Sequence, residues 1–141
     1  MPSIDWARVE IGQELPPRQH PAITKQQLVM YAGASGDFNL IHTDVETARA
    51  AGLTGTIAHG MLSMGFLAQY AGELAGDHGF VQRLKVRFSG MVFPGDVLTC
   101  RAQLLARDAH QHTVTVQLWA EREPDHPLTT GEAVVLLREM P

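Results

Sequence analysis

GMLSMGFLAQYAGEL, residues 60–74, is apolar on nearly every side and decides the fold. Its polar side chains are only Ser63, Gln69 and Glu73, a pattern typical of a helix that is enclosed on most sides. The same polar residues, with His59, interrupt the apolar stretch 57–75, so we do not expect it to span a membrane. We predict a buried core helix here.

The pattern changes to a period of two after this helix, as expected for strands. Apolar Leu84, Val86 and Phe88 alternate with basic residues, and in TVTVQLWA, residues 113–120, aliphatic side chains alternate with Thr, Gln and Trp. Further strands are predicted over residues 96–106 and 130–138, with turns near 108–111 and 124–127. About four long antiparallel strands after the helices predict an α+β fold, a single domain over residues 1–141 whose sheet wraps around the core helix.

Two shorter helices are predicted upstream of the core helix. Thr24 and Gln27 form a capping box, and the helical pattern then runs to Gly33. Thr43 and Glu46 form a second box, which opens about two turns of helix. The segment SGDFNLIH, residues 35–42, therefore connects two helices.

Composition narrows the classes of protein. The 141 residues are 45% hydrophobic and 18% charged, which suits one globular domain, and we expect no signal peptide. The net charge of −4 offers nucleic acid no broad basic surface. A single cysteine, Cys100, cannot form a disulfide within the chain, so a cytoplasmic location is expected by default. Cys100 lies in an alternating stretch and is expected to be a buried thiol.

The connection between the first two helices carries an acid and an imidazole, Asp37 and His42. In an extended loop the two could converge on one small ligand, with Asn39 bracing the loop. The apolar neighbours Phe38, Leu40 and Ile41 would desolvate the carboxylate, so the pair could share proton-transfer work. Alternatively, Asp37 makes an Asx-type turn and His42 is merely solvated.

The start of the core helix lacks a capping side chain, because Ala58-His59-Gly60-Met61 offers no Ser, Thr, Asp or Asn. Free N–H groups and the positive end of the helix dipole there suit a carbonyl oxygen that becomes an enolate, and Gly60 permits close approach. Alternatively, Gly60 acts as a modest cap, His59 is a core or interface residue, and Ser63 is a small packing residue.

Other candidates are weaker. Arg83, Lys85 and Arg87 share one strand face and could meet phosphates, or form an ordinary solvated face. His110 and His112 are spaced like metal ligands but sit at a turn without a third ligand, so no metal site is predicted. No phosphate loop, dinucleotide fingerprint or nucleophile elbow occurs, and no cofactor is predicted.

Three segments together resemble the MaoC-like hot-dog family of (R)-specific enoyl-CoA hydratases. YAGASGDFNLIHTDVETA, residues 31–48, resembles the family signature at Tyr31, Ser35, Gly36, Asp37, Asn39, Ile41, His42 and Ala48. AHGMLSMG at 58–65 resembles the start of its central helix, and VRFSGMVFPGDVLT at 86–99 its strand pair. The chain departs from the family at Leu40, where proline is usual.

The resemblance implies that Asp37 and His42 form the catalytic pair, that Asn39 supports them and that the Gly60 N–H binds the oxyanion, with Ser63 nearby. Expected substrate contacts are Arg83, Lys85, Arg87, His59 and Met61. The implied reaction is hydration of trans-2-enoyl-CoA to (3R)-3-hydroxyacyl-CoA, and its reverse, without a metal or redox cofactor. A homodimer or higher homo-oligomer acting on an acyl-CoA or acyl-carrier-protein thioester is expected, without nucleic acid or membrane partners.

Three alternatives share this fold. The chain could dehydrate (3R)-hydroxyacyl groups on acyl carrier protein in fatty-acid or polyketide synthesis. It could be a hot-dog thioesterase, although the Asp-x-Asn-x-x-His set argues against one. It could also be a non-catalytic acyl-thioester-binding subunit of a heterodimer, against which the intact Asp37 and His42 weigh. Acyl-chain length would depend on residues beside the core helix.

Overall fold

The computed structural model describes residues 3–138 and contains three α-helices and five strands. The N-terminal part holds a short 3-10 helix η1 (Trp6–Arg8), strand β1 (Glu14–Gln19), helix α1 (Lys25–Ser35), 3-10 helix η2 (Leu40–His42) and helix α2 (Val45–Ala50). The remainder holds helix α3 (Gly60–Ala75) and strands β2 (Gly79–Phe88), β3 (Thr99–Asp108), β4 (Thr113–Glu123) and β5 (His126–Leu137).

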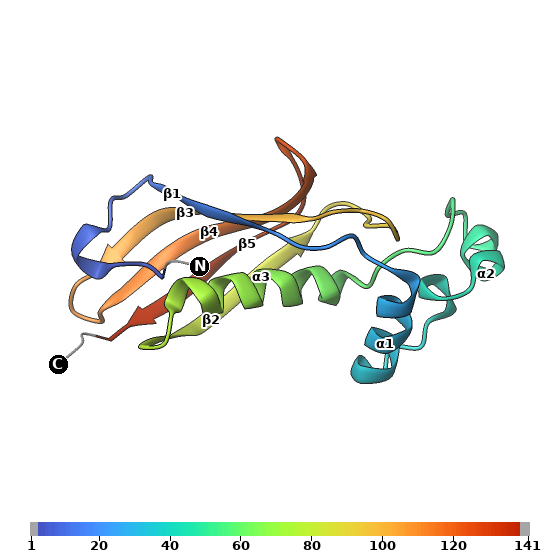
Figure 1. Cartoon of the computed structure of the whole chain (residues 1–141), viewed down its shortest axis with the longest axis horizontal. Helices are drawn as coiled ribbons and strands as arrows, with labels where there is room; N and C mark the ends of the chain where they lie inside the picture. The colour runs from blue at the N-terminus through green and yellow to red at the C-terminus, as the bar shows by residue number, and fades with distance from the viewer. Residues whose placement is uncertain (1–2, 139–141) are drawn as a thin grey trace.

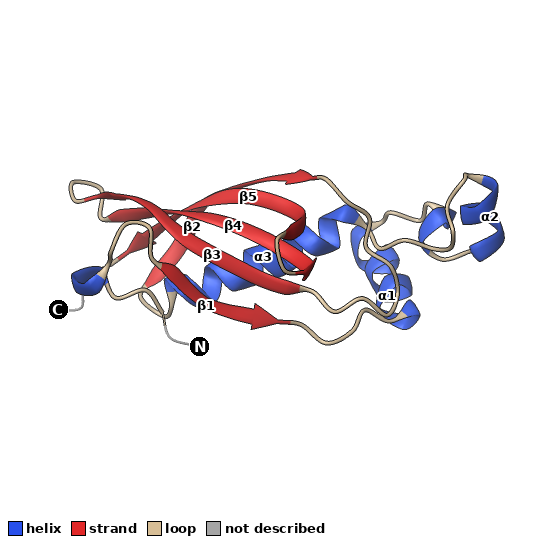
Figure 2. Cartoon of the chain, turned by 90° about the horizontal axis from the view of Figure 1, so that it is seen from above, coloured by secondary structure: helices blue, strands red, loops and turns tan. Residues whose placement is uncertain are grey.

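The five strands form one antiparallel sheet in the order β1-β3-β4-β5-β2. Helix α3 runs along one face of this sheet, while α1 and α2 project past its end, beside the start of α3 (Figures 1 and 2). The predicted α+β class is confirmed, and a sheet wrapped around one helix is the arrangement of the hot-dog fold. No helix within residues 3–138 is long and apolar enough to cross a membrane.

Strand β1 was missed by the pattern of alternation, which indicated about four strands. It contains Pro16 and Pro17, and its pairing with β3 shifts register between Leu15 and Arg18. Proline removes a ladder N–H, so prolines in a strand are tolerated at a sheet edge or a bulge, and β1 provides both. A bulged, proline-containing edge strand therefore escapes a search for strict alternation.

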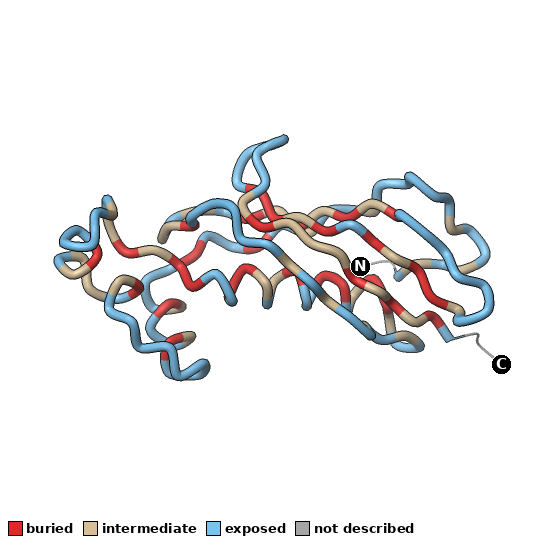
Figure 3. The backbone as a smooth tube through the Cα atoms, turned by 180° about the vertical axis from the view of Figure 1, so that it is seen from behind, coloured by how far each residue is buried: buried red, intermediate tan, exposed pale blue. Residues whose placement is uncertain are grey.

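The core lies between α3 and the sheet, and its buried residues occupy alternate positions of β3, β4 and β5. Figure 3 shows where buried residues fall along the backbone. Cys100 on β3 is fully buried, as expected, and burial raises the pKa of its thiol to about 12, so the thiol stays protonated. The expectation that α3 is enclosed on most sides is wrong for the single chain. One face of the helix is exposed because the sheet covers only the other; it carries Met61, Gly65, Ala68 and Gly72.

The helix caps agree only in part with the sequence patterns. Thr24 caps α1 by accepting a hydrogen bond from the Gln27 N–H at 3.0 Å, as predicted. The helix does not stop at Gly33, however, but continues to a left-handed Gly36 with φ 75°. The cap of α2 is Asp44, not Thr43: the Asp44 carboxylate accepts from the Thr47 N–H at 2.8 Å. Thr43 instead ends the preceding 3-10 helix η2.

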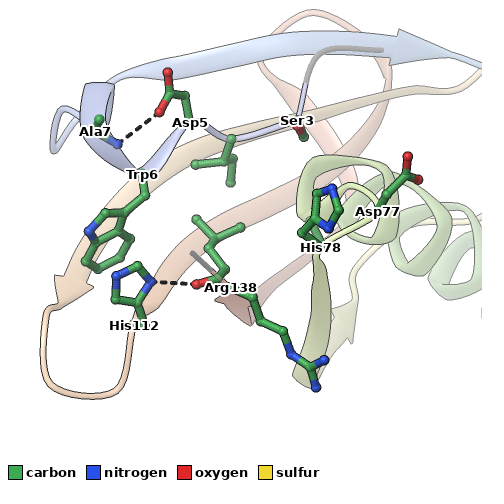
Figure 4. A pocket seen from close by; sticks show the side chains of 11 residues that line it. Ser3, Asp5, Trp6, Ala7, Asp77, His78, His112 and Arg138 are labelled. Carbon is green, nitrogen blue, oxygen red and sulfur yellow. Dashed lines mark hydrogen bonds between the residues drawn. The ribbon is translucent and has the colours of Figure 1, made fainter. Parts of the chain in front are cut away.

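A cavity of about 410 Å³ lies beside η1 and the end of β5 (Figure 4), at the opposite end of the molecule from α1 and α2 (Figure 1). Chain segments before β1, after α3 and at the end of β5 surround it, and Trp6 stacks on His112 with ring centroids 4.1 Å apart. The Arg107 guanidinium lies over the Trp6 ring at 4.1 Å. The cavity contains neither Asp37 nor His42, so it is separate from the site described next.

Candidate active site

The segment from Gly36 to Thr43 is shaped by its own short polar side chains. One carboxylate oxygen of Asp37, Oδ1, accepts a hydrogen bond from the Asn39 N–H at 3.2 Å. Asn39 in turn caps η2, because its Oδ1 accepts from the Ile41 N–H at 3.3 Å. The predicted bracing role of Asn39 thus has a structural basis, and the Asx-type turn considered for Asp37 is also present. That turn leaves the other carboxylate oxygen, Oδ2, free to face elsewhere.

His42 is buried, and its ring is oriented by a backbone group. Its Nδ1 lies 2.8 Å from the carbonyl oxygen of Ile57, in the segment before α3. A carbonyl only accepts hydrogen bonds, so Nδ1 carries a proton and donates. The other ring nitrogen, Nε2, faces Asp37 Oδ2 at 3.7 Å. The acid and the imidazole that the sequence singled out are therefore brought together.

The expected apolar surroundings of Asp37 are not found in the single chain. The Asp37 side chain is 51% exposed, and Phe38 and Leu40 are 68% and 54% exposed. The loop lies near one end of the molecule, beyond the sheet (Figure 1), and both of these apolar residues are more exposed than buried. Local sequence could not show this, because apolar neighbours along the chain can still point into solvent.

Helix α3 begins at Gly60 without a capping side chain, as predicted: His59 is the N-cap residue and its side chain makes no capping hydrogen bond. Within residues 3–138, the Gly60 N–H has no hydrogen-bond acceptor. The ring of Phe88, at the end of β2, covers Gly60 so closely that a Cβ atom there would lie 3.3 Å from it. Gly60 thus presents a free donor at the positive end of a 16-residue helix.

His59 is not exposed as a substrate contact would be, but is buried behind the acid and the imidazole. The residue is 2% exposed, and its ring stacks on that of His42 with centroids 3.7 Å apart. Its Nε2 lies 3.2 Å from the backbone carbonyl oxygen of Asp37. The ring of Tyr31 of α1 also contacts that of His59, with centroids 4.8 Å apart and a tilt of 57°. His59 therefore contacts both Asp37 and His42.

The remaining predicted site residues do not gather in one cluster around Asp37 and His42. Ser63 is buried at 2% exposure one turn into α3, whereas Met61 is 55% exposed beside Gly60. The basic residues of β2 are exposed and spread along this edge strand, with Arg87 next to Phe88 and Arg83 roughly 13 Å away by strand geometry. Arg83 is paired with Glu132 at 3.4 Å. Only the Arg87 end of this row lies near Gly60.

Asp37, His42 and His59 also have the composition of a metal site, and one ligand atom from each lies within 4.8 Å of the others. Their arrangement does not suit a shared ion. The two imidazole rings are stacked at an interplanar angle of 23°, so they face each other instead of directing lone pairs at one point. His59 Nε2 is already directed at the Asp37 carbonyl, which requires a proton on that nitrogen.

Three contacts of this site had no signal in the sequence patterns. The Ile57 carbonyl that orients His42 is a backbone group, to which any residue type contributes equally. Phe88 reaches Gly60 from a strand 28 residues further along the chain, and Tyr31 reaches His59 from α1. Such contacts depend on how the elements pack, so spacing along the chain does not predict them.

The fold and this acid–imidazole loop beside an uncapped helix together define a hot-dog domain of the hydratase and dehydratase class. The model of the family described as MaoC like domain matches residues 7–122. The chain belongs to this family, as its sequence resemblance indicated.

Individual relatives agree with the family. The solved structure of an (R)-hydratase from A. caviae involved in PHA biosynthesis superposes with a TM-score of 0.84 at 26% identity, covering 93% of this chain and 98% of that one. Fatty acid synthase subunit beta of Aspergillus oryzae is 32% identical over 95% of this chain, which spans only 7% of that protein. A peroxisomal enoyl-CoA hydratase 2 of Arabidopsis thaliana is 32% identical over 69% of this chain and 32% of its own length.

Proposed function

We propose that the chain catalyses the (R)-specific hydration of trans-2-enoyl-CoA to (3R)-3-hydroxyacyl-CoA, and the reverse dehydration. The observation that carries this proposal is the placement of Asp37 Oδ2 and His42 Nε2, 3.7 Å apart. That separation is too long for a direct hydrogen bond, but one water molecule standing beside the pair can contact both groups. The likeness to an (R)-hydratase and to an enoyl-CoA hydratase 2 supports the same reaction.

In the proposed mechanism the pair activates one water molecule. One of the two groups takes a proton from the water as its oxygen bonds to Cβ of the enoyl thioester. The electron pair of the double bond moves toward Cα, and negative charge collects on the thioester oxygen as an enolate. A proton from the same water then reaches Cα through the pair, so that both additions occur on one face. The net change is addition of H and OH across the double bond.

Gly60 supplies the proposed oxyanion contact. Its unpartnered N–H, at the start of α3, is free to donate to the thioester oxygen as charge develops there. Such a donor typically stabilises the transition state by about 3 kcal/mol. Asn39 keeps the loop in shape through its cap of η2, and Ser63, buried one turn further along α3, lies behind the reacting groups in this proposal.

The proposed acyl-CoA site extends along the end of β2. Lys85 and Arg87 are exposed cations on this edge strand, and the phosphates of CoA are suitable partners for them. Met61, beside Gly60, would contact the acyl thioester from the exposed side of α3. Arg83 is the least suited of the three basic residues, because it already pairs with Glu132.

We also propose that residues 1–141 act as one domain and that two copies associate. The exposed face of α3 carries small residues at Gly65, Ala68 and Gly72, which allow another helix to approach closely. Strand β2 is an edge strand, whose unpaired backbone groups are free to pair with a second chain. A two-fold arrangement would cover both surfaces at once.

Dehydration of (3R)-hydroxyacyl groups on acyl carrier protein is the second candidate, favoured by the likeness to a fatty acid synthase subunit. The same Asp37 and His42 would serve it, since the chemistry differs only in the carrier. Comparison of kcat/KM for crotonyl-CoA and for crotonyl-acyl carrier protein separates the two candidates. Release of free thiol from either substrate would instead indicate a thioesterase.

Substitution of the pair tests the proposal. We expect Asp37→Asn and His42→Ala each to lower kcat for hydration of crotonyl-CoA by roughly 10²–10⁴, the usual range for loss of an acid or base. Loss of the enoyl absorbance measures the rate. Asp77→Asn and His126→Ala, at exposed positions, are the matched controls and should retain full activity. If either variant of the pair keeps most of its activity with an intact fold, the assignment is wrong.

A further inference from the structure

We propose that His59 is a positioning residue, which holds Asp37 and His42 in their working arrangement and links both to Gly60. This inference rests on the proposed function, because the groups that His59 holds are the proposed catalytic pair. His59 was expected to contact the substrate, but the residue is only 2% exposed. Its effect on catalysis would therefore pass through its neighbours.

The first of its contacts fixes the backbone of Asp37. His59 Nε2 lies 3.2 Å from the Asp37 carbonyl oxygen, so the ring donates a proton from Nε2 to a group 22 residues earlier. The carboxylate of Asp37 is half exposed, and its Oδ1 makes only a local turn to Asn39. The hydrogen bond from His59 is thus a connection between the Asp37 backbone and the body of the domain.

The second contact fixes the plane of the His42 ring. The rings of His59 and His42 stack at 3.7 Å, and the edge of His42 is held by the Ile57 carbonyl at 2.8 Å. A ring held on one face and one edge keeps a single orientation, so its Nε2 remains directed at Asp37. Tyr31 supports His59 from α1.

The third observation separates positioning from simple core packing. Nδ1 of His59 is buried and has no hydrogen-bond partner within residues 3–138. An unmade hydrogen bond in a buried group destabilises the folded chain. An apolar ring would serve better if the side chain only filled the core. We therefore attribute this histidine to the hydrogen bond from its Nε2–H to the Asp37 carbonyl and to the stacking of its ring on His42.

The chain provides a matched control in His20. It is also buried, stacks on an aromatic ring (Phe66, centroids 4.1 Å apart) and has a ring nitrogen, Nε2, without a partner. No hydrogen bond or ring contact within the described residues joins it to Asp37 or His42. His20→Phe and His59→Phe therefore make the same chemical change at two buried histidines, of which one touches the pair.

Kinetics and stability of these variants test the proposal. We expect His59→Phe to stay folded, because loss of the Nε2–H bond to the Asp37 carbonyl is offset by removal of the unpartnered Nδ1, while kcat for crotonyl-CoA falls 10- to 100-fold and KM changes less than threefold. His20→Phe should keep the wild-type kcat. His59→Gln, which keeps a donor near the place of Nε2 but loses the stacked ring, should fall between wild type and His59→Phe. It also decides the question if His59→Phe does not fold.

A folded His59→Phe with wild-type kcat overturns the proposal, as does a His20→Phe that loses as much activity. The crystal structure of His59→Phe adds a readout that does not depend on activity. We expect the Asp37 carbonyl to shift, so that the separation of Asp37 Oδ2 and His42 Nε2 departs from 3.7 Å. An unchanged separation overturns the positioning role even if the wild type is not a hydratase. If the separation changes in His59→Phe and the wild type has no hydratase activity, the positioning role is supported and only the proposed function is overturned.

Discussion

His42 donates a hydrogen bond from Nδ1 to the backbone carbonyl of Ile57 at 2.8 Å, across 15 residues of chain. The Ile57 N–H returns a bond of 3.2 Å to the carbonyl of Ile41, so two bonds join the acid–imidazole loop to the segment before α3. Gly60 follows three residues later. The same connection thus sets both the direction of the imidazole and its distance from the free N–H at the helix start.

Gly60→Ala is expected to lower kcat/KM for crotonyl-CoA by roughly tenfold, a part of the loss seen when an oxyanion donor is removed. The added methyl would lie 3.3 Å from the Phe88 ring and would narrow the approach to the N–H. Phe88 is 47% exposed and can move slightly, so the fold should persist. Gly33→Ala in α1, where a Cβ meets nothing within 4 Å, is the control. An unchanged kcat/KM would show that the substrate does not approach Gly60 as closely as proposed.

Leu40→Pro is expected to raise the free energy of unfolding by about 0.4–1 kcal/mol, by restricting the unfolded chain. Leu40 is the first residue of η2, where proline is well accepted, and within residues 3–138 its N–H makes no hydrogen bond. Asn39 has a ψ of 121°, outside the α region that is disfavoured before proline. Urea denaturation measures the change. Ile41→Pro should destabilise instead, because it removes the bond to Asn39, and equal effects of the two would contradict this account.

His20 is expected to make stability depend on pH. Burial, and then the positive charge of Arg18, lowers the pKa of His20 below its ordinary value of 6.5, although Glu73 opposes this. As the pH falls below 6.5 the unfolded chain takes up a proton on His20 before the folded chain does. Protonation then favours unfolding, so stability present above that pH is lost as the pH falls toward the lower folded-state pKa.

His20→Gln removes this titrating group and tests the expectation. Between about pH 7.5 and about pH 5, the free energy of unfolding should fall less steeply in the variant than in the wild type. Urea denaturation at a series of pH values gives both slopes. Parallel slopes would show that His20 titrates alike in the folded and unfolded chains.

Ala68→Glu is expected to convert the proposed dimer to a monomer at micromolar concentration. Ala68 lies in the middle of the exposed face of α3, where a close helix contact has no room for a buried, unpaired carboxylate. Sedimentation velocity measures the mass. Ala109→Glu, the same change at an exposed turn, should leave the mass unchanged, and a dimeric Ala68→Glu would place the interface elsewhere.

The elements differ in how well the sequence predicts them. The apolar stretch 60–74 predicted α3 to within one residue, because a long helix leaves a strong periodic pattern. Strand β1 was missed because its prolines and bulge break the alternation. Asp37, His42 and the uncapped Gly60 were found from residue type and spacing. Their neighbours Ile57 and Phe88 were not, because backbone groups and distant strands leave no local pattern.

The sequence by itself determined the helix with its uncapped start, four of the five antiparallel strands and the loop that carries the acid and the imidazole. These depend on interactions between residues close together in the chain. Only the tertiary structure decided that Asp37 Oδ2 faces His42 Nε2, that Asp37 remains half exposed and that His59 lies buried behind both. Each of these depends on packing between segments that are distant in the chain, and such packing is settled by the fold as a whole.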